Sequence, residues 1–203
     1  MYKSGMTARQ VFDIVEQEAD ISVPIADSMC ALWLNASVQM LYSEIVREER
    51  NTVLSFPSSR SVSYSSLSVG AEEAAVEARD IVGVYGDGRE LERISGGIGA
   101  ILNTERPSWY DAGSEMNLLL PFTPENIRIA HIVRPALITA EQAETQEVCV
   151  PPEFVPMLLS RLRGEIYKVS NEDALAAKWL ADYNAELETF KVWAAQHGEV
   201  YGM

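Results

Sequence analysis

The stretch VPPEFVPMLLSRLRGEIYKVSNEDALAAKWLADYNAELETFKVWAAQH, residues 150–197, decides the fold of this chain. From about Glu172 to His197, apolar and aromatic side chains recur at steps of three and four residues: Ala176, Leu180, Tyr183, Leu187, Phe190 and Ala194. This spacing predicts a long helix with one buried face. The polar segment 170–173 suits the start of that helix, and Gly198 suits its end.

A second helix precedes the long one and begins near the double proline at 151–152, where missing N–H groups are tolerated. Its apolar residues also recur at helical spacing, and they are Val155, Leu158, Leu159, Leu162, Ile166 and Val169. A polar break at Ser170-Asn171 separates the two helices. The segment therefore predicts an antiparallel helical hairpin.

Two further helices are predicted at the start of the chain. Thr7 and Gln10 have the spacing of a capping box and open a short helix. A longer apolar pattern then runs from Ile25 to about Glu49 without a helix breaker. With the C-terminal hairpin, these helices predict a bundle of about four helices, two of them N-terminal and two C-terminal.

Between the helical regions the apolar pattern becomes alternating, and Ser, Gly and Pro become more frequent. The pattern predicts strands at 61–65, 80–85, 89–94, 116–120 and 127–133, with a hairpin turn at 86–88. We therefore expect an α+β protein in which the helical bundle carries an inserted small antiparallel β-sandwich or barrel. The expected domains are N-terminal helices at 1–50, a β-rich insert at 51–149, and a helical hairpin with a mobile tail at 150–203. The first six residues are also expected to be mobile.

Composition narrows the function. A chain with 47% hydrophobic and 23% charged residues is ordinary for a globular protein, and its two cysteines, Cys30 and Cys149, predict buried thiols. There is no signal-peptide pattern at the start and no apolar run near 18 residues, so neither export by that route nor membrane insertion is expected. The net charge of −14 includes no basic block, which argues against sequence-specific binding of nucleic acid.

Catalytic motifs are not visible in the sequence. His131 lies within an alternating apolar pattern, which favours a hydrogen-bonded sheet residue, and His197 lies in the last turn of the long helix, where it would complement the helix dipole. The glycines at 83–88 and 95–99 are better explained by turns than by a phosphate-binding loop. We therefore expect no catalytic residues, no cofactor and no metal. An enzyme would need a pocket that brings His131 together with carboxylates such as Asp80 or Asp111.

Large aromatic residues are the remaining candidates for recognition. Trp179 and Trp193 flank the buried stripe of the long helix and make its apolar face wider than one neighbouring helix covers, which indicates self-association. Trp109 and Tyr110 lie in a loop flanked by Pro and Gly. They support an alternative hypothesis, a binding module for a small ligand or carbohydrate with a helical stem for oligomerisation.

The order of motifs resembles the head-to-tail adaptor (gatekeeper) proteins of tailed bacteriophages, the type that binds beneath the portal. The resemblance rests on Arg106-Pro107-Ser108-Trp109, Leu118 to Pro124, Val133 to Leu137, Val150 to Arg161, and Asn171 to Ala176 followed by Tyr183. It covers most of the chain. The sequence departs from the family pattern at Ser63–Leu67 and in the Ala/Glu-rich segment 70–78.

The resemblance implies a structural virion protein at the head–tail junction, made in the host cytoplasm. It implies a self-associated ring, a dodecamer to match the portal, bound to the portal protein on one side and to tail or nozzle proteins on the other. DNA would pass through the lumen without specific binding, so we expect an acidic channel surface. The residues predicted for the portal or subunit interface are Trp179, Trp193, His197, Tyr201 and Met203, and the C-terminal segment is expected to become ordered on the portal.

Overall fold

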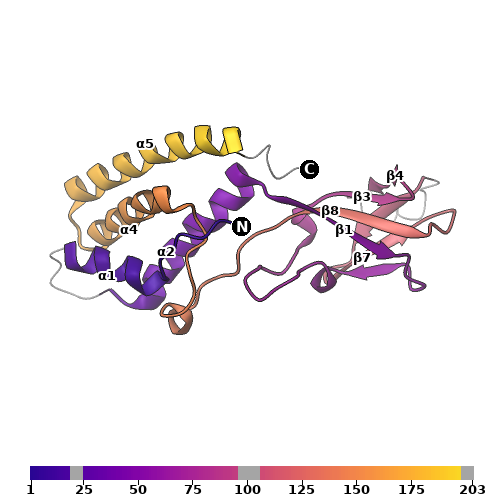
Figure 1. Cartoon of the computed structure of the whole chain (residues 1–203), viewed down its shortest axis with the longest axis horizontal. Helices are drawn as coiled ribbons and strands as arrows, with labels where there is room; N and C mark the ends of the chain where they lie inside the picture. Colours follow the sequence, from indigo (N-terminus) through magenta and orange to yellow (C-terminus); the bar gives the residue numbers. More distant parts are fainter. Residues whose placement is uncertain (19–24, 96–105, 198–203) are drawn as a thin grey trace. The chain divides into compact units, whose positions relative to one another are not determined.

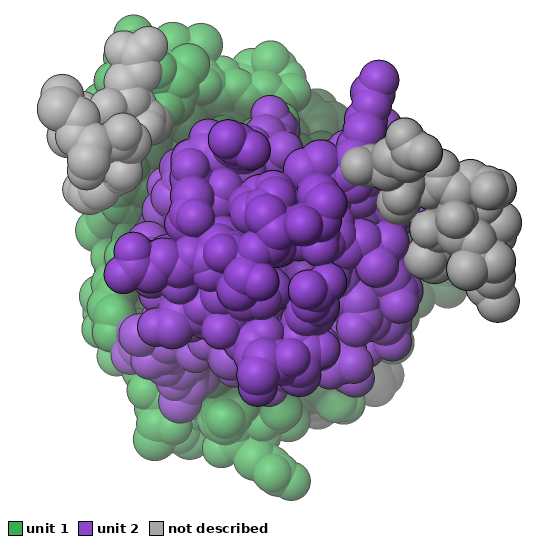
Figure 2. Space-filling view, turned by 90° about the vertical axis from the view of Figure 1, so that its right-hand side faces the viewer, with its two compact units in different colours: residues 1–47, 137–203 green, residues 48–136 purple. Residues whose placement is uncertain are grey.

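The computed structural model describes residues 1–18, 25–95 and 106–197, and these residues form an α+β protein (Figure 1). The chain divides into two compact units, drawn in green and purple in Figure 2. The helical unit consists of residues 1–47 and 137–203, and the β unit consists of residues 48–136. The predicted arrangement, a β-rich segment inserted into a helical domain, is therefore confirmed.

The described part of the helical unit contains four α-helices, as predicted. They are α1 (Ala8–Glu18), α2 (Asp27–Met40), α4 (Val155–Val169) and α5 (Asp173–His197). A π-helical segment η1 (Leu41–Val46) extends α2, and the 3₁₀ turns η4 (Ala140–Gln142) and η5 (Pro152–Phe154) lie in the connection that leads to α4. The helices share one core, in which Phe12, Leu34 and Leu158 are almost completely buried.

The C-terminal hairpin has the geometry that the sequence predicts. α4 ends at Val169, Asn171 takes a left-handed backbone conformation with φ of 60°, and α5 begins at Asp173 and lies along α4 (Figure 1). The buried side chains of α5 all belong to the predicted stripe: Ala176, Tyr183, Phe190 and Ala194. Because the stripe is narrow, most of the surface of α5 remains exposed.

Gly164 sets how closely α4 and α5 approach each other. A methyl group at Gly164 would lie 2.7 Å from Cγ and Cδ2 of Leu180 and 3.4 Å from the Leu180 backbone nitrogen. We expect Gly164→Ala to lower the free energy of unfolding by about 1–2 kcal/mol, because the overpacking cost exceeds the gain in helix propensity. Urea unfolding of Gly164→Ala, Leu180→Ala and the double variant measures the effect. The shorter side chain in Leu180→Ala should remove the penalty, so additive losses would contradict close packing as its cause.

The predicted domain boundaries need correction on both sides of the β unit. Residues 137–149 belong to the helical unit, because the Asn35 side chain forms hydrogen bonds with both the carbonyl and the N–H of Ile138, at 2.8 and 2.9 Å. The helical segment that starts with α2 ends at Val46 rather than Glu49, because Arg47 takes a left-handed conformation and the chain then enters a strand.

The start of the chain is held against the helical unit, so the expectation of a mobile segment at 1–6 is wrong. The Ser4 N–H donates to the carbonyl of Val148, and the Val148 N–H donates to the carbonyl of Met6, each at 3.0 Å. The Tyr2 N–H donates to the hydroxyl of Tyr42 at 3.1 Å. The predicted capping box of Thr7 and Gln10 is present at the start of α1.

The β unit contains two four-stranded sheets with the orders β1-β8-β3-β4 and β2-β7-β6-β5 among the described strands. The first sheet consists of β1 (Glu49–Ser55), β8 (Asn126–Ile132), β3 (Ile81–Gly86) and β4 (Arg89–Glu90). The second consists of β2 (Ser61–Ser63), β7 (Glu115–Leu119), β6 (Ser108–Asp111) and β5 (Glu92–Arg93). Both sheets contribute to one core, which is compatible with the predicted sandwich.

The strand predictions are partly correct. The hairpin between β3 and β4 turns at Asp87-Gly88, which both have positive φ, as a two-residue hairpin requires. The predicted strand at 61–65 ends at Ser63, because residues 64–66 form the 3₁₀ turn η2. The segment 89–94 divides between the two sheets, and β5 pairs with β6 in parallel, whereas we expected antiparallel pairs throughout. The glycines at 96–99 lie outside the described residues.

Candidate assembly surfaces

The outward side of α5 is a candidate surface for helix packing. Opposite its buried stripe, α5 carries a second row at helical spacing, and all of its members are exposed: Ala174, Ala177, Ala181, Ala185, Glu188, Val192 and Ala195. We call this row the outer stripe. Alanine has high helix propensity, so α5 forms readily, and its small side chains let another helix approach closely. The surface can therefore make van der Waals contacts along its length.

Trp193, predicted to lie at an interface, packs within its own helical unit. Its ring lies 5.2 Å from Tyr2 and 5.5 Å from Phe154 between centroids, both edge to face, and it stacks on Phe190 at 5.6 Å. The side chain is half-buried. Trp193 therefore holds the C-terminal half of α5 to the start of the chain and to the turn before α4, and it exposes only part of its surface.

The Trp179 ring also has contacts within its own unit, with two cationic side chains. The Arg163 guanidinium lies 4.6 Å from the Trp179 ring centroid, and the Lys178 ammonium lies 4.9 Å from it. Arg163 also pairs with Glu18, and burial lowers the pKa of Arg163. Nearby on α5, burial raises the pKa of Glu186. The indole therefore stabilises the hairpin through cation–π contacts.

The other predicted interface residues are at the end of α5 or beyond it. His197 is exposed, its ring stacks on Trp193 at 4.4 Å, and its Nδ1 lies 2.8 Å from the Trp193 carbonyl oxygen. Trp179 lies 14 residues before Trp193, about 21 Å along the helix axis at 1.5 Å per residue. The structure thus brings Trp193 and His197 together but not Trp179. Tyr201 and Met203 lie outside the described residues.

Strand β1, which the sequence did not predict, forms an edge of the first sheet among the described strands. Hydrogen bonds from Val133 N–H to the Glu48 carbonyl and from Phe56 N–H to the Glu125 carbonyl fix its phase against β8. Because antiparallel pairing alternates, the remaining residues of β1 direct their N–H and C=O groups away from β8. These residues are Glu49, Asn51, Val53 and Ser55, and all of their side chains are exposed.

His131 is a buried sheet residue, as predicted. Its Nε2 lies 3.1 Å from the Thr52 hydroxyl, and burial lowers its pKa, which favours the neutral ring. Beside it, Arg50 and Glu73 form a bidentate ion pair with contacts of 2.7 and 2.8 Å, and this pairing lowers the pKa of Glu73. The arrangement crosslinks β1 to the loop that precedes β3.

The carboxylates considered for catalysis have structural partners. Asp80 binds Arg134 at 2.7 Å, and Asp111 accepts hydrogen bonds from the Tyr64 hydroxyl at 3.1 Å and the Gly113 N–H at 2.9 Å. None of His131, Asp80 and Asp111 lines the groove described below. This groove therefore does not bring together the constellation that an enzyme would need.

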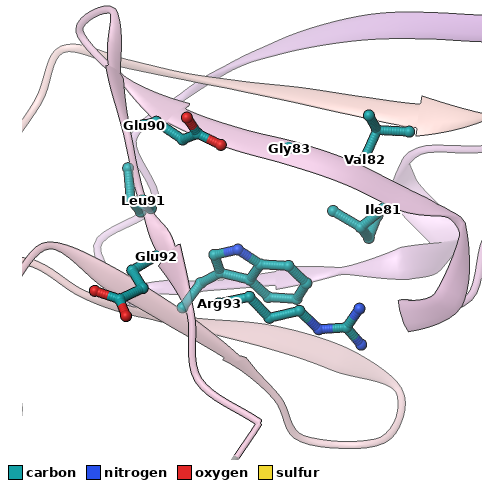
Figure 3. Close-up of a pocket in the computed structure, with 8 residues that line it drawn as sticks. Ile81, Val82, Gly83, Glu90, Leu91, Glu92 and Arg93 are labelled. Carbon is teal, nitrogen blue, oxygen red and sulfur yellow. The ribbon is translucent and has the colours of Figure 1, made fainter.

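An open groove of about 520 Å³ lies between β3 and the segment that forms β4 and β5 (Figure 3). It is lined by Ile81, Val82, Gly83, Glu90, Leu91, Glu92, Arg93 and Trp109. Trp109 is only 2% exposed, and the Arg93 guanidinium lies 5.0 Å from its ring centroid. Tyr110 is half-buried. The structure places Trp109 and Tyr110 in strand β6 rather than in the predicted loop, and the near-complete burial of the indole weakens the carbohydrate-binding alternative.

No protein-family model matches the chain, and no curated protein is significantly similar to it in sequence. The described residues contain no group of three or more His, Cys, Asp or Glu side chains that could hold a metal ion. Within the same residues, no helix has the length and apolar character needed to cross a membrane. Cys30 and Cys149 are buried, and burial raises the pKa of Cys30 to about 11.

Proposed function

We propose that this chain is a structural virion protein, a head-to-tail adaptor of a tailed bacteriophage. In this role it forms a ring between the portal protein and the tail or nozzle proteins, as a dodecamer that matches the portal. The observation that carries the proposal is α5, a 25-residue helix with four buried side chains and an exposed outer stripe in which five of the seven residues are alanines. A ring closes through heterologous contacts between neighbouring copies, and such a helix offers one of the two surfaces that the contact needs.

The charge of the chain suits a channel protein. A ring through which DNA passes must not retain it, and the net charge of −14 repels phosphate. The order of the helical and β-rich segments is also that of the adaptor family which the sequence resembles. In this assembly DNA moves through the lumen without specific contacts, and the protein needs no cofactor.

Quantitative mass spectrometry of purified virions from the phage that encodes this chain tests the proposal. We expect the chain in the particle at about one copy per copy of the portal protein, because stacked rings of matching symmetry contain equal numbers of subunits. Absence from the particle would contradict the proposal. That result would favour the ligand-binding alternative, in which the groove beside β3 is the site to screen.

The outer stripe can be tested separately. Ala181→Arg combined with Ala185→Arg places two long charged side chains on this row, and we expect the double variant to be excluded from particles while it keeps the helical circular-dichroism spectrum of the parent. The physical reason is that bulky charged groups prevent close helix approach. Asn184→Arg is the matched control, since Asn184 is exposed but lies beside the stripe. Normal incorporation of the double variant would contradict a helix contact at this surface.

A further inference from the structure

Within residues 1–18, 25–95 and 106–197, no backbone hydrogen bond covers the outer edge of β1, which is therefore an open hydrogen-bonding surface. Asn51, Val53 and Ser55 are uncharged, and Val53 is 61% exposed. β1 contains no proline and no lysine, and its pairing with β8 runs without a bulge. Proline, lysine and bulges are devices by which edge strands usually avoid pairing with other chains. The only charges of β1 are at its first two residues.

We propose that β1 pairs with β1 of a second copy of this chain, in an antiparallel two-fold arrangement. The length of β1 favours a second copy of the same strand as its partner. The other edge strands of the described sheets, β2, β4 and β5, contain three, two and two residues, so β1 with seven is matched only by itself. A two-fold contact uses the same surface on both copies and therefore needs no second site.

The phase of β1, together with full overlap of the two seven-residue strands, sets the register of this pairing. The outward residues form the hydrogen-bonded pairs, so Asn51 lies opposite Val53 of the second copy, and Glu49 lies opposite Ser55. Arg50 then faces Leu54, and no like charges lie opposite each other. Each outward N–H and C=O gains a partner, and the first sheets of the two copies join into one continuous sheet. Because a two-fold contact cannot by itself close a ring, this dimer is independent of the adaptor proposal.

Sedimentation velocity of the full chain over a wide concentration range tests the inference, and we expect a reversible dimer. Val53→Pro removes an N–H that points away from β8, so the chain's own ladder is kept while the intermolecular ladder loses a donor. We expect the dimer dissociation constant to rise at least about tenfold. Val53→Thr, which keeps the N–H and the branched side chain, should leave it unchanged. A monomer at every concentration would overturn the inference.

A second variant guards against misfolding of Val53→Pro. Asn51→Lys combined with Val53→Lys places lysines opposite each other across the two-fold axis without removing any N–H, and we expect the same loss of dimer, partly restored by high salt. Hydrogen exchange supplies the direct readout, because the Asn51 and Val53 amides should become protected as concentration rises. A dimer that survives both variants would overturn the inference. So would a monomer whose β1 amides become protected only when a strand of another protein is added.

Discussion

Replacing Asp80 with asparagine is expected to lower the free energy of unfolding by about 3 kcal/mol, the lower end of the range for a broken buried pair, because the buried Arg134 charge loses its nearest anion and keeps the longer contact with Glu77 at 3.9 Å. The side chains of Asp80 and Arg134 meet at 2.7 Å and are only 7% and 8% exposed. The same carboxylate oxygen accepts a hydrogen bond from the Glu77 N–H at 2.9 Å and so caps the turn η3 (Ala78–Asp80) that leads into β3. Asparagine preserves the size of the side chain and can keep that cap. The loss of unfolding free energy therefore reports the removal of the negative charge.

Chemical unfolding followed by circular dichroism, with hydrogen exchange of β3 and β8 as a probe of the β unit, measures this loss. Glu92→Gln is the matched control, because the ion pair of Glu92 with Arg106 is 3.6 Å long and exposed. Exposed pairs contribute little, so this control should change stability by less than about 1 kcal/mol. Adding Arg134→Met to Asp80→Asn should cost less than Arg134→Met alone, because the pair is coupled. Equal effects of Asp80→Asn and Glu92→Gln would contradict the buried-pair explanation.

The helices were predictable because their information is local. The three- and four-residue spacing of the C-terminal stretch gives the buried face of α5 directly, and the polar break gives the turn at Ser170-Asn171. The same stretch predicts an interface at Trp179 and Trp193. The sequence does not tell, however, which side chains of the same unit cover these two rings. The partners that bury these rings, Arg163 and Tyr2, lie far away in the chain or on a neighbouring helix. Burial depends on those tertiary contacts, which periodicity does not report.

The strands were less predictable, because their burial is shared between two sheets. β1 has half-buried side chains, Arg50, Thr52 and Leu54, on its inner face, and only one of them is aliphatic, so the alternation gives a weak apolar signal. β1 also begins only two residues after a helical segment ends. The helix that the apolar pattern predicts from Ile25 to about Glu49 therefore runs into its first residue. The split of residues 89–94 into β4 and β5 requires the chain to change sheets at Leu91, a step that no local pattern specifies.

Replacing Phe190 with alanine is expected to cost about 3–5 kcal/mol of unfolding free energy, the range for loss of a buried phenylalanine. Phe190 is 1% exposed, and its ring lies 4.6 Å from Phe154 and 5.6 Å from Trp193 between centroids. It is the largest fully buried side chain of α5. Because only four side chains of α5 are buried, the loss of Phe190 removes a large share of the contacts that hold this helix.

The Phe190 variant also tests how α5 depends on packing. Helices of ordinary composition are marginal in isolation, so the C-terminal half of α5 should exchange its amides faster once Phe190 is removed, while α1 and α2 keep their protection relative to global unfolding. Val192→Ala is the matched control, because Val192 lies on the outer stripe, two residues away, and is 60% exposed. It should change stability by less than about 0.5 kcal/mol. If the control lost as much stability as Phe190→Ala, the outer stripe would be part of the core of the free chain, and it could not serve as a surface for a neighbouring subunit.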